Sequence, residues 1–182
     1  MLRLMLLRHA KSDWSEAGLH DFDRPLNERG RQAAPLMGAH LATHALLPDR
    51  ILCSTARRAR ETLALMLPHL SGDSDVGLTR RLYDEGEDDY VAIIHALGGN
   101  AHSLMLIAHN PAIQATALAL IGNGNPALRD EIAEKFPTAA LAVIDFDAES
   151  WADVEKDSGR VVAFFRPKLL AGGITGEAAN ES

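Results

Sequence analysis

The run Leu2-Arg3-Leu4-Met5-Leu6-Leu7, followed directly by Arg8-His9, decides the fold class. It is apolar apart from Arg3 and does not alternate with polar residues, which is typical of a strand covered on both faces, as in a parallel sheet. Two further short apolar runs, 51–53 and 104–108, have the same character. Because segments with helical spacing separate the three runs, the pattern favours an α/β fold with helices on both faces of a sheet.

The remaining elements follow from apolar spacing and from helix-start and helix-stop residues. We expect helices at 27–45, 57–67, 88–97 and 111–121, a short helix from 126, and strands at 139–146 and 160–166. The Ser-, Asp- and Gly-rich residues 71–77 are expected to form a loop. The chain is therefore predicted to be a three-layer α/β/α sandwich with a mostly parallel central sheet. It should form one domain over residues 1–166, with a flexible tail at 167–182.

The composition excludes several classes of partner. Hydrophobic residues make up 47% and charged residues 24% of the 182 positions, as in ordinary globular proteins. The net charge is -7 and no Lys/Arg-rich block is present, so neither nucleic acid nor an anionic membrane is an expected partner. A single cysteine, Cys53, forms no internal disulfide, and no apolar run reaches the ~18 residues of a membrane helix. We expect the protein to be cytoplasmic.

Polar residues follow the first three strands at the point where each strand ends. The first leads into Arg8-His9, the second into Ser54 and then Arg57-Arg58, and the third into His109-Asn110. Ligands of open α/β sheets bind outside the carboxyl ends of the strands, so two histidines and at least two arginines should gather at one edge.

This set of residues suits phosphoryl transfer. Arginine binds phosphate oxygens two at a time, and helix N-termini add N–H donors and partial positive charge. A neutral histidine can attack phosphorus and hold the phosphoryl group covalently. The chemistry depends mainly on positioning and charge stabilisation, and these residues require no metal and no other cofactor.

Four segments resemble motifs of the histidine phosphatase superfamily, the phosphoglycerate mutase-like proteins. They occur in the family's order and span most of residues 2–120. The segments are Leu6-Leu7-Arg8-His9-Ala10-Lys11-Ser12-Asp13-Trp14, Arg24-Pro25-Leu26-Asn27-Glu28-Arg29-Gly30-Arg31-Gln32-Ala33, Ser54-Thr55-Ala56-Arg57-Arg58-Ala59-Arg60-Glu61-Thr62 and Ala108-His109-Asn110-Pro111. The chain length and the Arg-His-Ala-Lys-Ser variant resemble the short SixA-like branch of phosphohistidine phosphatases.

The resemblance implies a role for each matching residue. His9 would be the nucleophile that becomes phosphohistidine, and Arg8 and Arg58 would grip the phosphoryl oxygens. His109 would hydrogen-bond the same group and stabilise the transition state. Ser15 takes the place where many members carry a phosphate-contacting Asn.

Two assignments stay open. Arg57 is an alternative to Arg58, although the family pattern favours Arg58. Many members use a carboxylic acid between the second and third strands to protonate the leaving oxygen. Glu85 is the candidate here, with Asp84 or no acid at all as alternatives, because an acidic run before a helix is also a common solvated capping segment.

The uncertain acid bears on the substrate. An alkoxide leaving group needs a proton from a positioned acid, whereas an imidazole leaving group can carry its own proton before the P–N bond breaks. We therefore expect a metal-independent phosphatase acting on phosphohistidine in a protein. The alternatives are a phosphatase or mutase of small phosphate esters and a non-catalytic phosphate-binding module.

Overall fold

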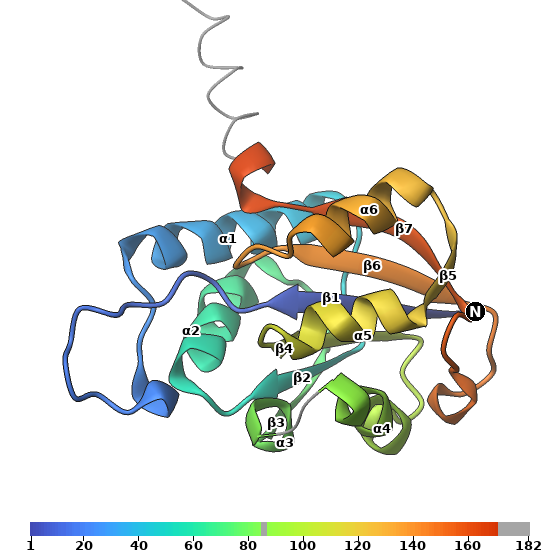
Figure 1. The fold of residues 1–182 in the computed structure, drawn as a ribbon, viewed down its shortest axis with the longest axis horizontal. Coiled ribbons are helices and arrows are strands. Elements are labelled where there is room, and N and C mark those ends of the chain that lie inside the picture. The colour runs from blue at the N-terminus through green and yellow to red at the C-terminus, as the bar shows by residue number, and fades with distance from the viewer. Residues whose placement is uncertain (85–86, 171–182) are drawn as a thin grey trace, which may run out of the picture.

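A seven-stranded sheet forms the centre of the molecule, and helices cover both of its faces (Figure 1). The computed structural model describes residues 1–84 and 87–170. The strands are β1 (Leu2–Arg8), β2 (Arg50–Ser54), β3 (Asp75–Thr79), β4 (Ser103–Ala108), β5 (Ile121–Gly124), β6 (Leu141–Phe146) and β7 (Gly159–Phe165), in the spatial order β3-β2-β4-β1-β6-β7-β5. β6 is antiparallel to its neighbours β1 and β7, and the other adjacent pairs are parallel. The expected α/β fold with a mostly parallel sheet is confirmed.

Between β1 and β7, the described part of the chain forms six α-helices and three short 3-10 turns. The helices are α1 (Glu28–Thr43), α2 (Arg57–Met66), α3 (Arg81–Asp84), α4 (Glu87–Leu97), α5 (Ala112–Leu120) and α6 (Pro126–Glu134), and the 3-10 turns are η1 (Asp21–Asp23), η2 (Leu67–His69) and η3 (Trp151–Asp153). None of the helices found there is long and apolar enough to cross a membrane.

The central strands are apolar on both sides because each side meets a helical layer. In β1, Met5 and Leu7 pack against α1 and α2, while Leu4 and Leu6 belong to a second core formed with α4, α5 and α6. All four side chains are fully buried. Adjacent residues of a strand point to opposite faces, so a run without alternation is what two covered faces require.

Both edge strands were missed by the apolar pattern. We expected residues 71–77 to form a loop, but β3 starts at Asp75 and pairs with β2. Its side chains are mostly exposed, so it carries no buried apolar run. The Gly-Asn-Gly stretch between two expected helices was expected only to end the first of them, yet it belongs to β5 beside β7. The single turn of α3 was also not expected.

The antiparallel strand β6 starts at the carboxyl edge of the parallel strands and brings a further segment to it. The backbone N–H of Ala139, just before β6, donates to the carbonyl oxygens of Arg8 and His9 at 3.0 Å. β7 then leads to a helical turn at residues 167–170, where Leu170 packs against the α1–α2 side of the core. The rest of the expected tail, 171–182, lies outside the described residues.

Candidate active site

The carboxyl ends of β1, β2 and β4 meet at one edge of the sheet. Arg8 pairs with Ala108 in the β1–β4 ladder, and Cys53 pairs with Ile107 in the β2–β4 ladder. The residues that follow these pairs in the three strands therefore lie at the same height along the sheet. The rings of His9 and His109 lie side by side, with their centroids 5.1 Å apart.

The hydrogen bonds of His9 define its tautomer. Nδ1 lies 2.7 Å from the carbonyl oxygen of Ala10, and a carbonyl can only accept, so Nδ1 carries the proton. Nε2 is then the unprotonated nitrogen, and it accepts a hydrogen bond from Nε–H of Arg58 at 3.3 Å. A lone pair on Nε2 is what a nucleophile needs, and it faces the guanidinium that would hold the phosphoryl oxygens.

Burial and charge keep both histidines neutral. His9 is 6% exposed, and burial, the neighbouring His109 and the charge of Arg58 hold its pKa well below the usual value. Burial and then the charge of Arg58 lower the pKa of His109 to about 3. A protonated His9 could not attack phosphorus, so the environment maintains the reactive form at neutral pH.

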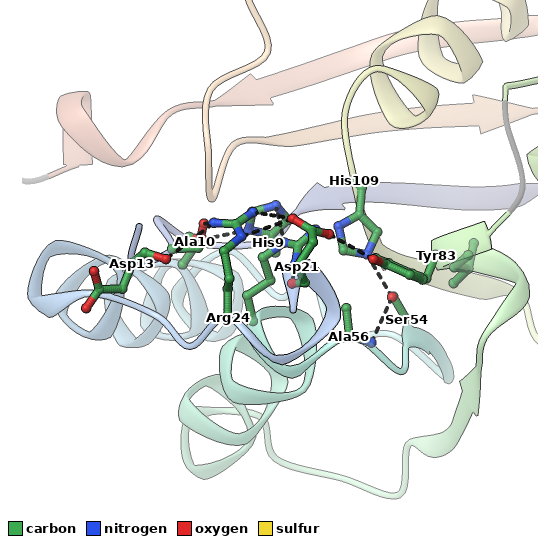
Figure 2. A network of polar contacts seen from close by, with 12 residues as sticks. His9, Ala10, Asp13, Asp21, Arg24, Ser54, Ala56, Tyr83 and His109 are labelled. Atoms are coloured by element: carbon green, nitrogen blue, oxygen red, sulfur yellow. Dashed lines mark hydrogen bonds and ion pairs between the residues drawn. The ribbon is translucent and has the colours of Figure 1, made fainter. Parts of the chain in front are cut away.

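Ser54 orients His109 (Figure 2). The serine Oγ accepts from the backbone N–H of Ala56 at 3.2 Å and lies 2.7 Å from Nε2 of His109. Among the described residues the hydroxyl hydrogen has no other acceptor, so we assign it to Nε2 of His109, and Nδ1 then carries the proton. That Nδ1 is buried and has no partner among the described residues, which leaves its N–H for a ligand in the pocket.

Each of the two predicted phosphate-binding arginines is held by a backbone carbonyl group. Arg8 donates through Nη1 to the carbonyl oxygen of Phe136 at 2.9 Å, on the segment that leads to β6. Arg58 lies in the first turn of α2 and donates through Nη1 to the carbonyl oxygen of Asp21 at 2.7 Å. Their fixed positions lower the ordering cost of binding an anion between them.

The loop between β1 and α1 returns to the site and supplies residues that the sequence did not single out. Asp21 accepts hydrogen bonds from Arg58 (3.2 Å), Arg24 (3.0 Å) and the hydroxyl of Tyr83 (2.9 Å) (Figure 2). The guanidinium of Arg24 lies 3.4 Å from the ring centroid of Trp14, which is 72% exposed. In the sequence, no motif distinguishes Asp21 from its polar neighbours His20 and Asp23, so no sequence signal could have identified it.

Two contacts fix the start of this loop against the helices. The hydroxyl of Thr62 on α2 accepts from the backbone N–H of Ala10 at 3.0 Å and donates to the carbonyl oxygen of Arg58 at 2.7 Å. On α1, a Cβ added to Gly30 would lie 2.1 Å from the carbonyl oxygen of Lys11. Glycine at position 30 therefore lets the helix approach the backbone that follows the nucleophile.

Four of the sequence-predicted residues come together, and the others do not join them. His9, Arg8, Arg58 and His109 all line one pocket of about 340 Å³. Ser15 is exposed and does not line it; the backbone N–H of Ser15 donates to Asp13, and Ser12 lines the pocket instead.

The alternatives for the second arginine and the acid also lie away from the pocket or outside the described chain. Arg57 is half exposed and forms an ion pair with Glu61 on the surface of α2. Asp84 is exposed and forms an ion pair with Arg80. Glu85 lies outside the described residues.

The fold and the pocket together define a class of protein. A neutral histidine with an unprotonated Nε2, a second histidine and several cationic side chains lie at the carboxyl edge of an α/β sheet, and this arrangement suits a phosphoryl anion. Comparison with known proteins identifies the family. The family model described as histidine phosphatase superfamily (branch 1) matches residues 4–85, and the chain belongs to this superfamily.

Individual relatives cover almost the whole chain. An uncharacterised protein of Mycobacterium tuberculosis is 38% identical over 164 residues, which are 89% of this chain and 100% of the relative. The crystal structure of a candidate phosphohistidine phosphatase SixA from Agrobacterium tumefaciens is 34% identical, with a TM-score of 0.77 over 91% of this chain and 98% of that one. A similar candidate SixA from Nakamurella multipartita is 29% identical, with a TM-score of 0.78 over 91% of this chain and 96% of that one.

Proposed function

We propose that this protein is a metal-independent phosphatase that removes the phosphoryl group from phosphohistidine in a protein, through a phosphohistidine intermediate on His9. The observation that carries the proposal is the Nδ1–H tautomer of buried His9, whose Nε2 lone pair lies beside Arg58. The likeness to candidate phosphohistidine phosphatases supports the substrate class. Exposed Trp14, at the rim of the pocket, offers apolar surface to a polypeptide.

The reaction proceeds in two displacements. In the first, Nε2 of His9 attacks phosphorus, the P–N bond of the substrate breaks, and its electron pair stays on the departing ring nitrogen. In the second, water attacks phosphorus, the bond to Nε2 breaks, and inorganic phosphate leaves with one proton of the water passing to solvent or phosphate. Arg8, Arg58 and the Nδ1–H of His109 would stabilise the equatorial oxygens in both steps.

The intermediate provides the test. Wild-type protein mixed with a ³²P-labelled phosphohistidine peptide and quenched in alkali should carry label that is stable to alkali and lost in acid, as expected of phosphohistidine. His9→Ala should carry no label and release no phosphate, whereas the control His44→Ala, changed at an exposed histidine, should behave as wild type. Full turnover by His9→Ala would exclude the proposed nucleophile. A wild-type protein that binds phosphate but never releases it would instead be a binding module.

A further inference from the structure

The pocket contains one carboxylate to which the proposed reaction assigns no role. Among the described residues that line the pocket, Asp21 supplies the single acidic side chain, and its neighbours are arginines, a lysine and the two histidines. It lies on the returning loop, its Oδ2 accepts from the same Arg58 that donates to Nε2 of His9, and its side chain is 47% exposed. Its carboxylate therefore lies beside a predicted phosphate-binding group and is open to a ligand.

We propose that the Asp21 carboxylate accepts a hydrogen bond from the far ring N–H of a phosphohistidine substrate, and so holds on the leaving imidazole the proton that makes it a good leaving group. The inference rests on the proposed function and deepens it. It makes Asp21 a residue that selects phosphohistidine over phosphate esters.

The ionisation state of Asp21 excludes a role as a proton donor. Partial burial acts to raise its pKa, but the hydrogen bond from Tyr83 and the charges of Arg58 and Arg24 outweigh this effect and lower the pKa to about 2. The carboxylate is therefore ionised at neutral pH. His109 is neutral, as is His9, and Tyr83 already donates its hydroxyl proton to Asp21. The carboxylate and the two histidines of the pocket thus offer no acidic proton to an alkoxide.

A leaving imidazole has a different requirement. The P–N bond breaks with its electron pair on one ring nitrogen, and the product is a neutral imidazole only if the other nitrogen holds a proton. A carboxylate beside that second nitrogen favours its protonated form, as an adjacent anion does for any histidine. Atoms and charges then balance without a proton from the enzyme.

The contacts of Asp21 allow this exchange of partners. Its Oδ2 is shared by Tyr83 Oη at 2.9 Å and Arg58 Nη2 at 3.2 Å. The phosphoryl group of a bound substrate, placed beside His9, would attract the Nη2–H of Arg58, because a phosphate oxygen carries more charge than a carboxylate oxygen. The site on Oδ2 that Arg58 leaves would then accept the N–H of the substrate ring.

The test compares two substrates and two variants. Asp21→Asn removes the charge with little change of shape, and Asp23→Asn makes the same change on the exposed side of the same 3-10 turn. The substrates are a synthetic phosphohistidine peptide and p-nitrophenyl phosphate, whose leaving group needs no proton. We expect Asp21→Asn to lower kcat on the peptide about tenfold or more relative to kcat on the ester, because both substrates share any loss from a displaced Arg58 and only the peptide loses the ring contact. Asp23→Asn should leave both rates within about twofold.

The pH profile separates contact with substrate from simple positioning of Arg58. In the wild type, kcat on the peptide should fall as pH rises through the pKa of the bound substrate ring. Asp21→Asn should move that fall to lower pH by about half a unit or more, because the variant no longer favours the protonated ring. Asp21→Glu, which retains a carboxylate, should restore part of the rate on the peptide. It should also move the decrease of kcat back towards the higher pH at which it occurs in the wild type.

The possible failures are distinct. Equal losses on both substrates with an unmoved profile would mean that Asp21 only positions Arg58, and unchanged rates in Asp21→Asn would remove its role altogether; either result overturns this inference alone. A wild type that hydrolyses the ester and not the peptide would overturn the proposed substrate, and this inference with it.

Discussion

The hydroxyl of Ser54, at the end of β2, lies 2.7 Å from Nε2 of His109, at the end of β4. This contact makes a strand-end serine the residue that decides which nitrogen of His109 is protonated. Because His109 is neutral, its tautomer determines whether it presents a donor or a lone pair to a phosphoryl oxygen.

Removing this hydroxyl should therefore impair turnover without disturbing the fold. In Ser54→Ala, Nε2 of His109 is free to take the proton, and Nδ1 then presents a lone pair that repels the phosphoryl oxygen. We expect kcat on p-nitrophenyl phosphate to fall roughly 10- to 100-fold, the range found when a partner that orients a histidine is removed. Steady-state kinetics and circular dichroism would measure the two effects.

A matched change isolates the tautomer. Ser103, at the start of β4, also hydrogen-bonds through its hydroxyl, but it lies at the opposite edge of the sheet. Ser103→Ala should keep the wild-type rate. If Ser54→Ala were equally active, the tautomer assigned to His109 would be incorrect.

Arg58 and Arg57 are adjacent in sequence and should respond very differently to the same substitution. Arg58 is buried and its guanidinium contacts His9 and Asp21, so the point charge of a lysine cannot reproduce its planar set of donors. We expect Arg58→Lys to lower kcat/KM by about 100-fold or more. Among the described residues, Arg57 forms its ion pair with Glu61 alone, at the surface, so Arg57→Lys should keep kcat/KM within about twofold of the wild type.

Kinetics of the two variants on p-nitrophenyl phosphate decide between these neighbours. A larger loss from Arg57→Lys would transfer the phosphate-binding role to Arg57.

Stability should depend on pH through His109. Its pKa drops from 6.5 in the unfolded chain to about 3 in the fold, so the unfolded state binds more protons between these values. The free energy of unfolding should then be highest above pH 6.5 and fall as the pH is lowered towards 3. For His109 alone, the loss between pH 7 and pH 5 amounts to at most about 2 kcal/mol.

Urea unfolding at both pH values would measure this loss in the wild type and in His109→Gln, which cannot titrate. The variant should lose less stability than the wild type over the interval. His20→Gln, changed at an exposed histidine of the loop, is the control and should match the wild type. Identical losses in His109→Gln and the wild type would mean that His109 is not held neutral by burial.

Predictions from the sequence were most successful for the strands that are buried on both faces. The two-faced apolar runs of β1, β2 and β4 identified the parallel sheet, and the residues after them identified His9, Arg8, Arg58 and His109. Predictions were least successful at the sheet edges. There β3 and β5 have mostly exposed or glycine-rich residues, and strand pairing instead of side-chain pattern defines them.

Only the tertiary structure decided where the loop between β1 and α1 lies. A bridge between Ser12 and Leu26 closes this loop on itself, and it returns Asp21 to the pocket. The local sequence around Asp21 does not encode that return, because it depends on distant partners such as Arg58 and Tyr83. The tautomers of His9 and His109 likewise follow from hydrogen bonds that exist only in the fold. The sequence alone therefore identified the candidate reacting groups, while tertiary contacts determined their protonation and the carboxylate beside them.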